Sequence, residues 1–241
     1  MIRTVAETGS TNADLLGLLR TGTVKEGFWL RAERQTAGRG RQGRAWVSPP
    51  GNFQSSTVVR LGPTEPSPAT LGFVAAVALE QVVGNLLGRD GIHGDGDSPV
   101  LKWPNDLLID GAKLSGILLE RTGDAVVIGI GVNLAHHPDL ADRRTTSLAT
   151  HGVFTDPASF AELLAISFAE WLARWRDLGF AAIRARWLAR AHPPGTLLRA
   201  ALPDGSEVEG AFEDMDAAGA LILRLAFGER RSIHAGDVFL V

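Results

Sequence analysis

Residues 101–116 constrain what this chain can fold into more than any other part of the sequence. Their pattern predicts two strands joined by a reversal, and Asp110-Gly111 is the tight-turn signal that makes the reversal. The turn returns the chain so that Lys113 is expected to lie across from Lys102. Because Asp106 belongs to the same hairpin, the sequence predicts two ammonium groups and a carboxylate gathered in one place.

The use of lysine supports a special role for this hairpin. The chain has 24 lysine and arginine residues but only three lysines, Lys25, Lys102 and Lys113. Lysine carries a compact point charge and arginine a planar fork, so chemistry that needs the compact charge would not tolerate the exchange. The string Trp103-Pro104-Asn105 adds a proline that cannot join a central ladder, and the backbone is expected to bulge there. A surface hairpin with a routine ion pair would not need these residues.

A second feature is the loop Ala37-Gly38-Arg39-Gly40-Arg41-Gln42-Gly43-Arg44. Its glycines let the backbone approach a ligand closely, and its guanidinium groups suit a phosphate or a carboxylate. A solvated basic loop, or an arginine-glycine segment that binds RNA non-specifically, is the alternative. The loop follows a predicted strand and precedes Trp46, which favours an ordered structure. We expect the Trp46 and Trp103 rings to be available for stacking.

Two shorter motifs are more ambiguous. In Thr8-Gly9-Ser10-Thr11-Asn12 the polar side chains suit a polar ligand, but Thr11 with Asp14 also resembles a helix capping box. Gly129-Ile130-Gly131-Val132-Asn133 ends an apolar strand with an amide, and a β-bulge is the alternative there. It is not a dinucleotide fingerprint, since the third glycine and following helix are missing. The adjacent His136-His137 pair indicates a loop, and we predict no metal site.

Composition narrows the class of protein. A chain of 241 residues fits one large domain, or one large and one small. A net charge of −3 argues against a general nucleic-acid binder, and the absence of cysteine excludes disulfides, thiolate metal sites and a cysteine nucleophile. The N-terminus lacks a signal-peptide pattern, and the apolar runs are interrupted before the roughly 18 residues of a membrane span. We therefore expect a cytoplasmic protein outside the membrane.

The pattern of elements predicts an α+β fold with a mixed, largely antiparallel sheet. Expected strands are 2–7, 27–33, 52–60, 100–103, 106–109, 116–121 and 125–133, and expected helices are 13–20, 70–87, 159–179 and 181–191. A glycine- and aspartate-rich turn is expected at 88–98. After His192-Pro193-Pro194-Gly195, five short strands predict a small barrel. This divides the chain into domains 1–192 and 193–241.

The motifs together resemble those of biotin protein ligases, in which they appear in the same order. They are Thr8-Gly9-Ser10-Thr11-Asn12, the string from Gln35 through Arg44, Lys102-Trp103-Pro104-Asn105-Asp106, Lys113-Leu114-Ser115-Gly116-Ile117-Leu118 and Gly129-Ile130-Gly131-Val132-Asn133. The resemblance covers nearly the whole chain. It implies a catalytic domain similar to class II synthetases, followed by a C-terminal SH3-like β-barrel.

The resemblance also implies a two-step ligase. Biotin and magnesium ATP would give biotinyl-5′-adenylate and pyrophosphate, and a lysine of a biotin carboxyl carrier domain would then displace AMP. The Ser10-Thr11-Asn12 motif begins almost at once, so we expect no DNA-binding domain before it. A monomer and a homodimer both remain open. The barrel is expected to help position ATP or the carrier, with Arg230 and Arg231 as the exposed charges to examine.

Site residues follow from the same resemblance. Biotin would be held by Ser10, Thr11, Asn12, Gln35, Gly38, Arg39, Gly40, Arg41, Lys113 and Gly116. The nucleotide would be held by Arg41, Trp46, Lys102, Asn105 and Asn133. Arg39, Asp106 and Lys113 would act in catalysis, because cations offset the repulsion between a carboxylate and an α-phosphate and a carboxylate can orient the proton of the acceptor amine.

Two positions depart from the family pattern. Gln54 stands where tyrosine or an aliphatic residue is usual, and Ser115 where alanine is common; we expect altered packing from both. A lipoate or octanoate transfer enzyme of similar fold is the nearest alternative function. A non-catalytic nucleic-acid binder is the alternative from another class.

Overall fold

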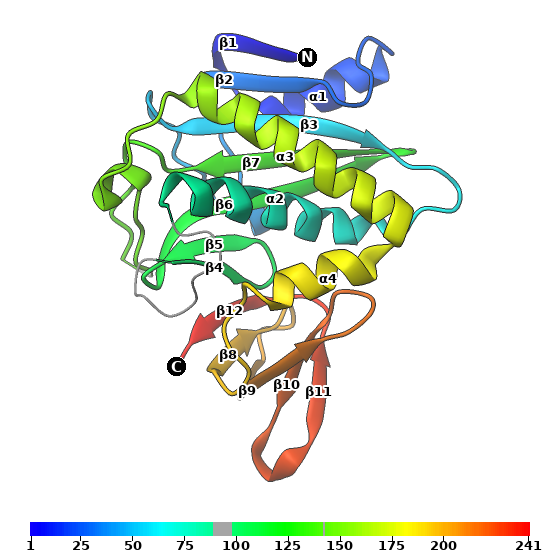
Figure 1. Ribbon diagram of the computed structural model, residues 1–241, viewed down its shortest axis with the longest axis vertical. Coiled ribbons are helices and arrows are strands. Elements are labelled where there is room, and N and C mark those ends of the chain that lie inside the picture. The colour runs from blue at the N-terminus through cyan, green and yellow to red at the C-terminus, as the bar shows by residue number, and fades with distance from the viewer. Residues whose placement is uncertain (89–97, 142) are drawn as a thin grey trace.

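The computed structural model describes residues 1–88, 98–141 and 143–241 (Figure 1). A seven-stranded sheet runs in the order β1-β2-β3-β7-β6-β5-β4, in which β1 pairs parallel with β2 and every other pair is antiparallel. The mixed, largely antiparallel sheet is therefore confirmed. Its strands are β1 (Ile2–Thr8), β2 (Trp29–Gln35), β3 (Phe53–Arg60), β4 (Pro99–Lys102), β5 (Asp106–Ile109), β6 (Ala112–Thr122) and β7 (Ala125–Val132).

Helices cover both faces of this sheet. They are α1 (Thr11–Arg20), α2 (Leu71–Leu86), α3 (Pro157–Leu178) and α4 (Phe180–Leu188), with short 3-10 turns η1 (Arg41–Gly43), η2 (Pro68–Thr70), η3 (Leu148–His151) and η4 (Ala226–Gly228). Side chains alternate between the faces of a strand. On β7, Val126 and Ile128 belong to the core cluster that includes α2, whereas Val127 packs with Leu15 of α1. Figure 1 views the face covered by α2 and α3.

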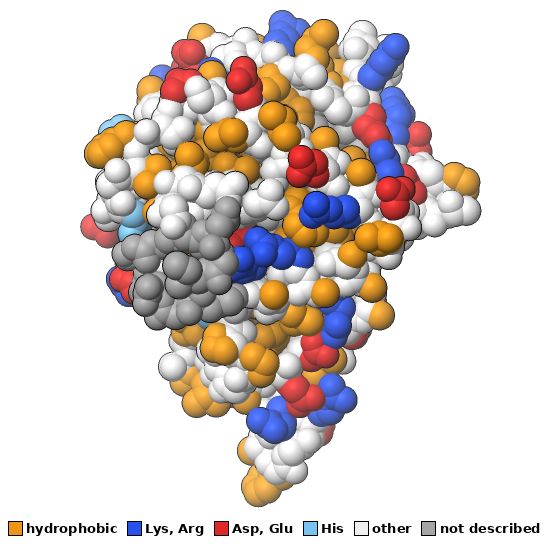
Figure 2. All heavy atoms as spheres, viewed as in Figure 1, with side chains coloured by type: hydrophobic (Ala, Val, Ile, Leu, Met, Phe, Trp, Pro, Cys, Tyr) orange, Lys and Arg blue, Asp and Glu red, His pale blue; other side chains and the backbone are white. Residues whose placement is uncertain are grey.

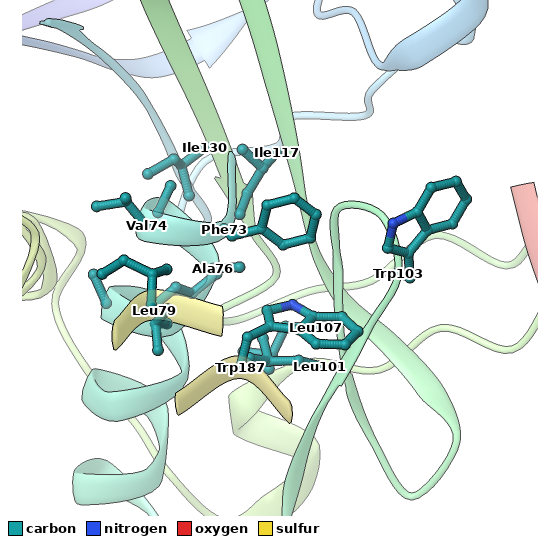
Figure 3. Packing of buried hydrophobic residues seen from close by; sticks show 14 of the residues in the cluster. Phe73, Val74, Ala76, Leu79, Leu101, Trp103, Leu107, Ile117, Ile130 and Trp187 are labelled. Carbon is teal, nitrogen blue, oxygen red and sulfur yellow. The ribbon is translucent and has the colours of Figure 1, made fainter. Parts of the chain in front are cut away.

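Helix α2 forms the centre of the larger core. Phe73, Val74 and Leu79 are buried there, and Figure 3 shows them beside Ile117 and Ile130 of the central strands. Glu80 and Gln81 interrupt the apolar run of α2, as expected, yet residues 68–86, which comprise η2 and α2, form a stretch of 19 residues that is long and apolar enough to cross a membrane by length and composition. Of its most apolar window, 78% is buried inside the protein. Its hydropathy is therefore accounted for by packing between the sheet and α3.

The C-terminal segment forms a separate five-stranded antiparallel sheet with the order β11-β10-β9-β8-β12. Its strands are β8 (Leu197–Ala201), β9 (Glu207–Met215), β10 (Leu221–Arg224), β11 (Arg230–Ile233) and β12 (Asp237–Leu240). We call residues 193–241 the C-terminal domain. It lies at the narrow end of the molecule, beside α4 and the β4–β5 hairpin (Figure 1).

Apolar and polar contacts join this domain to the larger sheet. Trp187 of α4 packs edge-on against Phe212 with ring centroids 6.5 Å apart. Trp103 donates from its indole nitrogen to the Gly219 carbonyl at 3.0 Å, and it is only 4% exposed. In Figure 3 its ring lies apart from the side chains of α2. The Trp103 indole therefore contributes to the junction between the two sheets. Trp103 also lines the cleft described below, so its stacking on a ligand stays a prediction.

One local expectation is wrong, and another falls on residues that the structure does not describe. The capping box at the start of α1 is wrong: the helix begins at Thr11, Ser10 is the N-cap, and no side chain caps it. Asp14 instead accepts a hydrogen bond from the Thr8 hydroxyl at 2.6 Å. The turn expected at 88–98 falls almost entirely on residues 89–97, which lie outside the described residues.

Ion pairs are distributed over the face that carries α3 and α4, where Figure 2 shows acidic and basic side chains beside one another. Arg176 of α3 contacts Glu26 and Glu65, each at 2.7 Å, and so ties the helix to loops flanking β2 and β3. Its hydrogen bond to Glu26 raises the pKa of Arg176 above the usual value. Arg184 of α4 pairs with Asp214 of β9 at 2.6 Å.

The buried tryptophans on the helices should contribute strongly to the free energy of unfolding. Trp175 of α3 is fully buried, and its indole donates to the Thr70 hydroxyl at 2.8 Å. Trp175→Ala is predicted to lower the free energy of unfolding by about 3–5 kcal/mol, because it leaves a cavity. Ile166→Ala, at an exposed position of the same helix, should change it by less than about 0.5 kcal/mol. Equal losses in denaturant titrations of the two variants would contradict this assignment of the core.

Candidate active site

A cleft opens on the sheet face opposite α2. Its walls come from the loop after β2, the hairpin of β4 and β5, the ends of β6 and β7, residues 138–145, and β12 of the C-terminal domain. Most of the motifs singled out in the sequence meet here. We refer to this depression as the cleft.

The hairpin gathers its charged groups as predicted. Lys102 and Asp106 are directly paired across β4 and β5. Asp106 is 8% exposed, and its carboxylate lies 2.6 Å from the Lys113 ammonium and 3.7 Å from that of Lys102. Asp106 thus holds both lysines of the segment in one ion triad.

An irregularity in β6 places Lys113 in the cleft. The pairing of β5 with β6 shifts register between Leu107 and Leu108, so that β6 carries Leu114 as an extra residue. Strict alternation would put Lys113 on the same face as Ile117. With the bulge, Leu114 joins Ile117 in the core and Lys113 lines the cleft. The bulge expected near Pro104 is not found: residues 103–105 form the turn between β4 and β5, whose pairing is regular. The bulge lies instead at Leu114, which sequence reasoning did not find.

Burial changes the pKa of Lys102, one of the two lysines of the triad. Desolvation lowers the pKa of the Lys102 ammonium, the Asp106 carboxylate raises it in part, and the Lys113 charge lowers it further. The Lys102 ammonium also lies 5.5 Å from the centre of the Phe239 ring of β12. Lys102 therefore sits in a drier environment than a surface lysine, with its charge sustained by a single carboxylate of the hairpin.

The glycine-arginine loop closes on itself. Gly40 donates to the Arg44 carbonyl at 2.7 Å, and Arg44 donates to the Arg41 carbonyl at 3.2 Å. Gly38 has no room for a side chain, because a Cβ there would lie 2.5 Å from the Trp46 carbonyl oxygen. Arg39 is exposed and lines the cleft, and no partner for its side chain is found in the described part of the chain. Its guanidinium is available to an anion.

At the other end of the cleft lies a polar network, in which the residues that line the cleft, Ser10, Thr11, Asn12 and Gln35, are uncharged. Both the backbone nitrogen and the hydroxyl of Thr11 donate to the Gln35 side-chain oxygen, at 2.9 and 3.1 Å. The Thr11 hydroxyl also meets Ser56 at 2.6 Å, Ser56 donates to Asn12, and Asn12 donates to Glu120. Thr11 therefore serves the cleft and not the helix cap.

The two glycines of β7 make room for this architecture. A Cβ at Gly129 would lie 2.4 Å from the Asn12 side-chain oxygen, and one at Gly131 would lie 2.3 Å from the Trp46 ring. The pairing of β3 with β7 continues in register through both glycines, so the bulge alternative is wrong at this motif. The indole of Trp46 lies directly over the sheet, with the Lys113 ammonium 5.9 Å from its centre.

Two buried acceptors in the cleft lack a protein partner among the described residues. They are the side-chain oxygens of Gln54 and Asn133, residues that are 1% and 2% exposed. The Gln54 amide nitrogen is committed to the Ala32 and Glu33 carbonyls, at 3.0 and 2.7 Å. Because a buried acceptor is costly to leave unpaired, both atoms indicate a ligand with N–H or O–H donors.

Most predicted site residues reach the cleft. Those lining it are Ser10, Thr11, Asn12, Gln35, Arg39, Gly40, Arg41, Trp46, Lys102, Asn105, Asp106, Lys113, Gly116 and Asn133. Gly38 is not among them and packs behind the loop. Ser115, a departure from the family pattern, is fully buried and donates to the Gly131 carbonyl at 2.6 Å.

Sequence reasoning missed the contributions of Gln54, Arg143 and the C-terminal strand β12. Asp237, Val238 and Phe239 of β12 line the cleft. No local sequence pattern predicts this contribution. Neither Arg230 nor Arg231 is a lining residue, and both stand on β11 at the opposite edge of their sheet.

The cleft is strongly electropositive. Among its described lining residues, six are cationic and two are carboxylates, although the whole chain carries a net charge of −3. The cations are Arg39, Arg41, Arg44, Lys102, Lys113 and Arg143, and the carboxylates are Asp106 and Asp237. Such a concentration favours a multiply charged anion.

Comparison with known proteins agrees with this geometry. The chain matches the Biotin/lipoate A/B protein ligase family over residues 5–133 and the Biotin protein ligase C terminal domain over 199–241. It is 42% identical to the biotin--[acetyl-CoA-carboxylase] ligase of Paracoccus denitrificans, covering 98% of both chains. Identity to the Mycobacterium tuberculosis ligase of the same name is 36%, covering 97% of this chain and 86% of that one.

The fold gives an independent comparison. The biotin protein ligase from Aquifex aeolicus in complex with biotin and ATP matches with a TM-score of 0.85 and 22% identity, over 100% of this chain and 99% of that one. That likeness concerns the fold alone. The sequence matches establish that the chain belongs to the biotin/lipoate A/B protein ligase family.

The close approach of Trp46 to β7 can be tested by overpacking. Gly131→Ala is predicted to cost about 1–3 kcal/mol of unfolding free energy, because the new methyl group displaces the indole. In a Trp46→Ala background the same change should cost almost nothing, since the obstructing ring is gone. Gly17→Ala on α1 meets only a side-chain atom 4.0 Å away and should be neutral or mildly stabilising. An equal cost of Gly131→Ala in both backgrounds would contradict the contact.

Proposed function

We propose that this chain is an ATP-dependent ligase that activates biotin as biotinyl-5′-adenylate and transfers it to a lysine of a biotin carboxyl carrier domain. The observation that carries the proposal is the composition of the cleft, which joins a neutral hydrogen-bonding end to a strongly cationic end. Biotin has a neutral ureido head and a carboxylate tail, and ATP is a multiply charged anion. Family membership and the names of two similar relatives support the same reaction.

The polar network suits the ureido head of biotin. A ureido group presents one carbonyl acceptor and two N–H donors. Ser10 and Thr11 place hydroxyls at this end of the cleft, and Gln35 lies beside Thr11. The free acceptor of Gln54 matches a ureido N–H. Gln54 would thus act in recognition of the substrate, where sequence analysis expected only altered packing.

The cationic end suits the activation step. An oxygen of the biotin carboxylate attacks the α-phosphorus of ATP, and the bond to the bridging oxygen of pyrophosphate breaks. The two reactants repel each other because both are anions, and charge builds on the phosphoryl oxygens. Lys102 and Lys113, which both contact Asp106, and Arg39 of the glycine-arginine loop would offset this charge. Trp46 offers a flat face beside Lys113, and Asn133 an unpaired acceptor, for the nucleotide.

Magnesium enters this scheme with the nucleotide. The described residues contain no group of three or more His, Asp or Glu side chains placed to hold a metal ion, and both carboxylates of the cleft are engaged by cations. Magnesium keeps several waters and commonly binds through substrate phosphates. We therefore treat magnesium ATP as the substrate and assign no protein cage to the metal.

Transfer is the second step. The acceptor ε-amine attacks the acyl carbon of the adenylate, the bond to the phosphate oxygen breaks, and AMP leaves with its electron pair. The amine has an unperturbed pKa of about 10.4 and must lose a proton to react. Asp106 lines the cleft, and its carboxylate can orient the amine and receive that proton. Closure of the glycine-arginine loop would keep water from the anhydride.

The wider assignments belong to the same proposal. The acceptor is the biotin carrier of a carboxylase, as the names of the relatives suggest. The division into domains 1–192 and 193–241 is supported by the two separate sheets. The cytoplasmic location and the choice between monomer and homodimer stay predictions.

The two alternatives are less well supported. A lipoate or octanoate enzyme would share the family match of residues 5–133, but the match at 199–241 is to a domain of biotin ligases. A nucleic-acid binder would present its arginines on an open surface. Arg41 and Arg44 are instead directed toward Asp237 across the cleft.

Pyrophosphate release tests the function directly. With ATP and magnesium present, biotin as the sole added acid should stimulate release, whereas lipoic and octanoic acids should not. Omitting the carrier should leave a single turnover, because the adenylate stays bound. Stimulation by lipoic acid with none by biotin would overturn the substrate assignment. A salt-sensitive shift of random RNA without any pyrophosphate release would favour the binding alternative.

Substitution of Lys113 tests most directly whether a compact cation is needed for adenylate formation. Lys113→Ala and Lys113→Arg should each slow adenylate formation by about a hundredfold or more, since the Asp106 contact accommodates a compact cation and not a wide fork. Lys25→Arg, at an exposed position outside the cleft, is the matched control and should retain full activity. An arginine variant at 113 with a near wild-type rate would contradict the argument from charge shape.

A further inference from the structure

The glycine-arginine loop is bound by the C-terminal domain. Arg44 contacts both carboxylate oxygens of Asp237, at 2.8 and 3.0 Å. Arg41 lies 3.5 Å from the same carboxylate and donates to the Gly236 carbonyl at 3.2 Å. Two arginines of one loop therefore converge on the turn that begins β12, about two hundred residues away in sequence.

This contact differs from an ordinary surface ion pair. The side chains of Asp237 and Arg41 are only 21% and 24% exposed, and a carboxylate shared by two guanidinium groups is geometrically restrictive. Arg41 also donates to the Asn105 side chain at 3.3 Å. Arg41 thus meets the β4–β5 hairpin and the C-terminal domain at once. Burial lowers the pKa of Arg41 and the Asp237 charge opposes that change, so removing Asp237 leaves a poorly compensated cation.

The backbone contacts of the loop fall into two groups. At its base, Ala37 donates to the Gly9 carbonyl and the Gly38 carbonyl accepts from Trp46. Beyond the base the loop is held by itself: Gly40 donates to the Arg44 carbonyl, Arg44 donates to the Arg41 carbonyl, and Arg39 bridges to Ala45. Within the described chain, the Arg41 and Arg44 side chains contact Asn105 and the β12 turn outside the loop. Asp237 is therefore the charged group that fixes the arginine-bearing end of the loop over the cleft.

We propose that Asp237 is a positioning residue that latches the glycine-arginine loop closed, so that the C-terminal domain sets how long the cleft stays shut. The latch leaves the Arg39 side chain unengaged and directed to the ligand. The role of the latch in the reaction rests on the proposed function. In that reaction a closed loop retains the adenylate between the two chemical steps. The latch itself is a property of the protein without ligand.

The experiment compares Asp237→Asn with two matched variants. Asp237→Glu keeps the charge and should restore most of the wild-type behaviour. Asp214→Asn removes a different ion pair between the same domain and the larger one, with Arg184 of α4 at 2.6 Å, and its partners do not line the cleft. Circular dichroism and melting curves of all three should match the wild type closely enough to show that each variant is folded.

Limited trypsin cleavage measures the opening of the loop in the absence of any ligand. Asp237→Asn should be cut within residues 39–44 about tenfold faster than wild type, because loss of a charged hydrogen-bond network is worth roughly one power of ten in the opening equilibrium. Asp214→Asn and Asp237→Glu should be cut at nearly the wild-type rate. Equal cleavage of Asp237→Asn and wild type would overturn the latch, and so would equal acceleration by Asp214→Asn.

The rate at which bound adenylate is released measures the effect of the latch on the reaction. After labelled biotin and ATP have loaded each protein with adenylate, Asp237→Asn should release its bound adenylate about tenfold faster than wild type in a chase, measured as a rate per bound adenylate. Equal retention by the variant and wild type would overturn the role in catalysis. If no adenylate forms in the wild type, the proposed function fails, whereas the trypsin result still decides the latch.

Discussion

An excess of positive charge held in one cleft is the constraint to which the rest of the site is fitted. Burying a cation is costly unless a carboxylate or a ligand compensates it. Asp106 compensates Lys102 and Lys113 from inside the hairpin, and Asp237 compensates Arg41 and Arg44 from the C-terminal domain. The cations still outnumber the carboxylates among the described lining residues. The protein is therefore prepared for anionic substrates, and their binding completes its electrostatics.

The central strands serve the core and the cleft at the same time. Alternation lets Ile128 and Ile130 of β7 pack toward α2 while Gly129 and Gly131 face the cleft. On β6 the two demands conflict, and the bulge at Leu114 resolves the conflict by turning Lys113 into the cleft. The rigid apolar side of the sheet thereby fixes the reactive side, which is how a precise site is supported on regular elements.

Local signals explain how much of this could be predicted. The Lys102, Asp106 and Lys113 cluster could be predicted because these residues are close in sequence, and two tight turns, at 103–105 and 110–111, fold β4, β5 and β6 against one another. Long-range requirements left no such signal: the role of Asp237 depends on a contact 193 residues away. The reading of Thr11 as a cap failed because its hydroxyl has tertiary partners in Gln35 and Ser56. The glycines of β7 likewise looked like a bulge, since the Trp46 and Asn12 side chains that occupy their space come from elsewhere in the chain.

A crystal structure with a non-hydrolysable analogue of biotinyl-5′-adenylate tests the central claim most directly. The account predicts that the bridging phosphate lies within hydrogen-bonding distance of the Lys113 ammonium and that the ureido head reaches Thr11 and Gln54. The loop should remain closed, with Arg41 and Arg44 still on Asp237. A ligand bound outside the cleft, or one whose phosphate faces away from Lys113, would contradict the account.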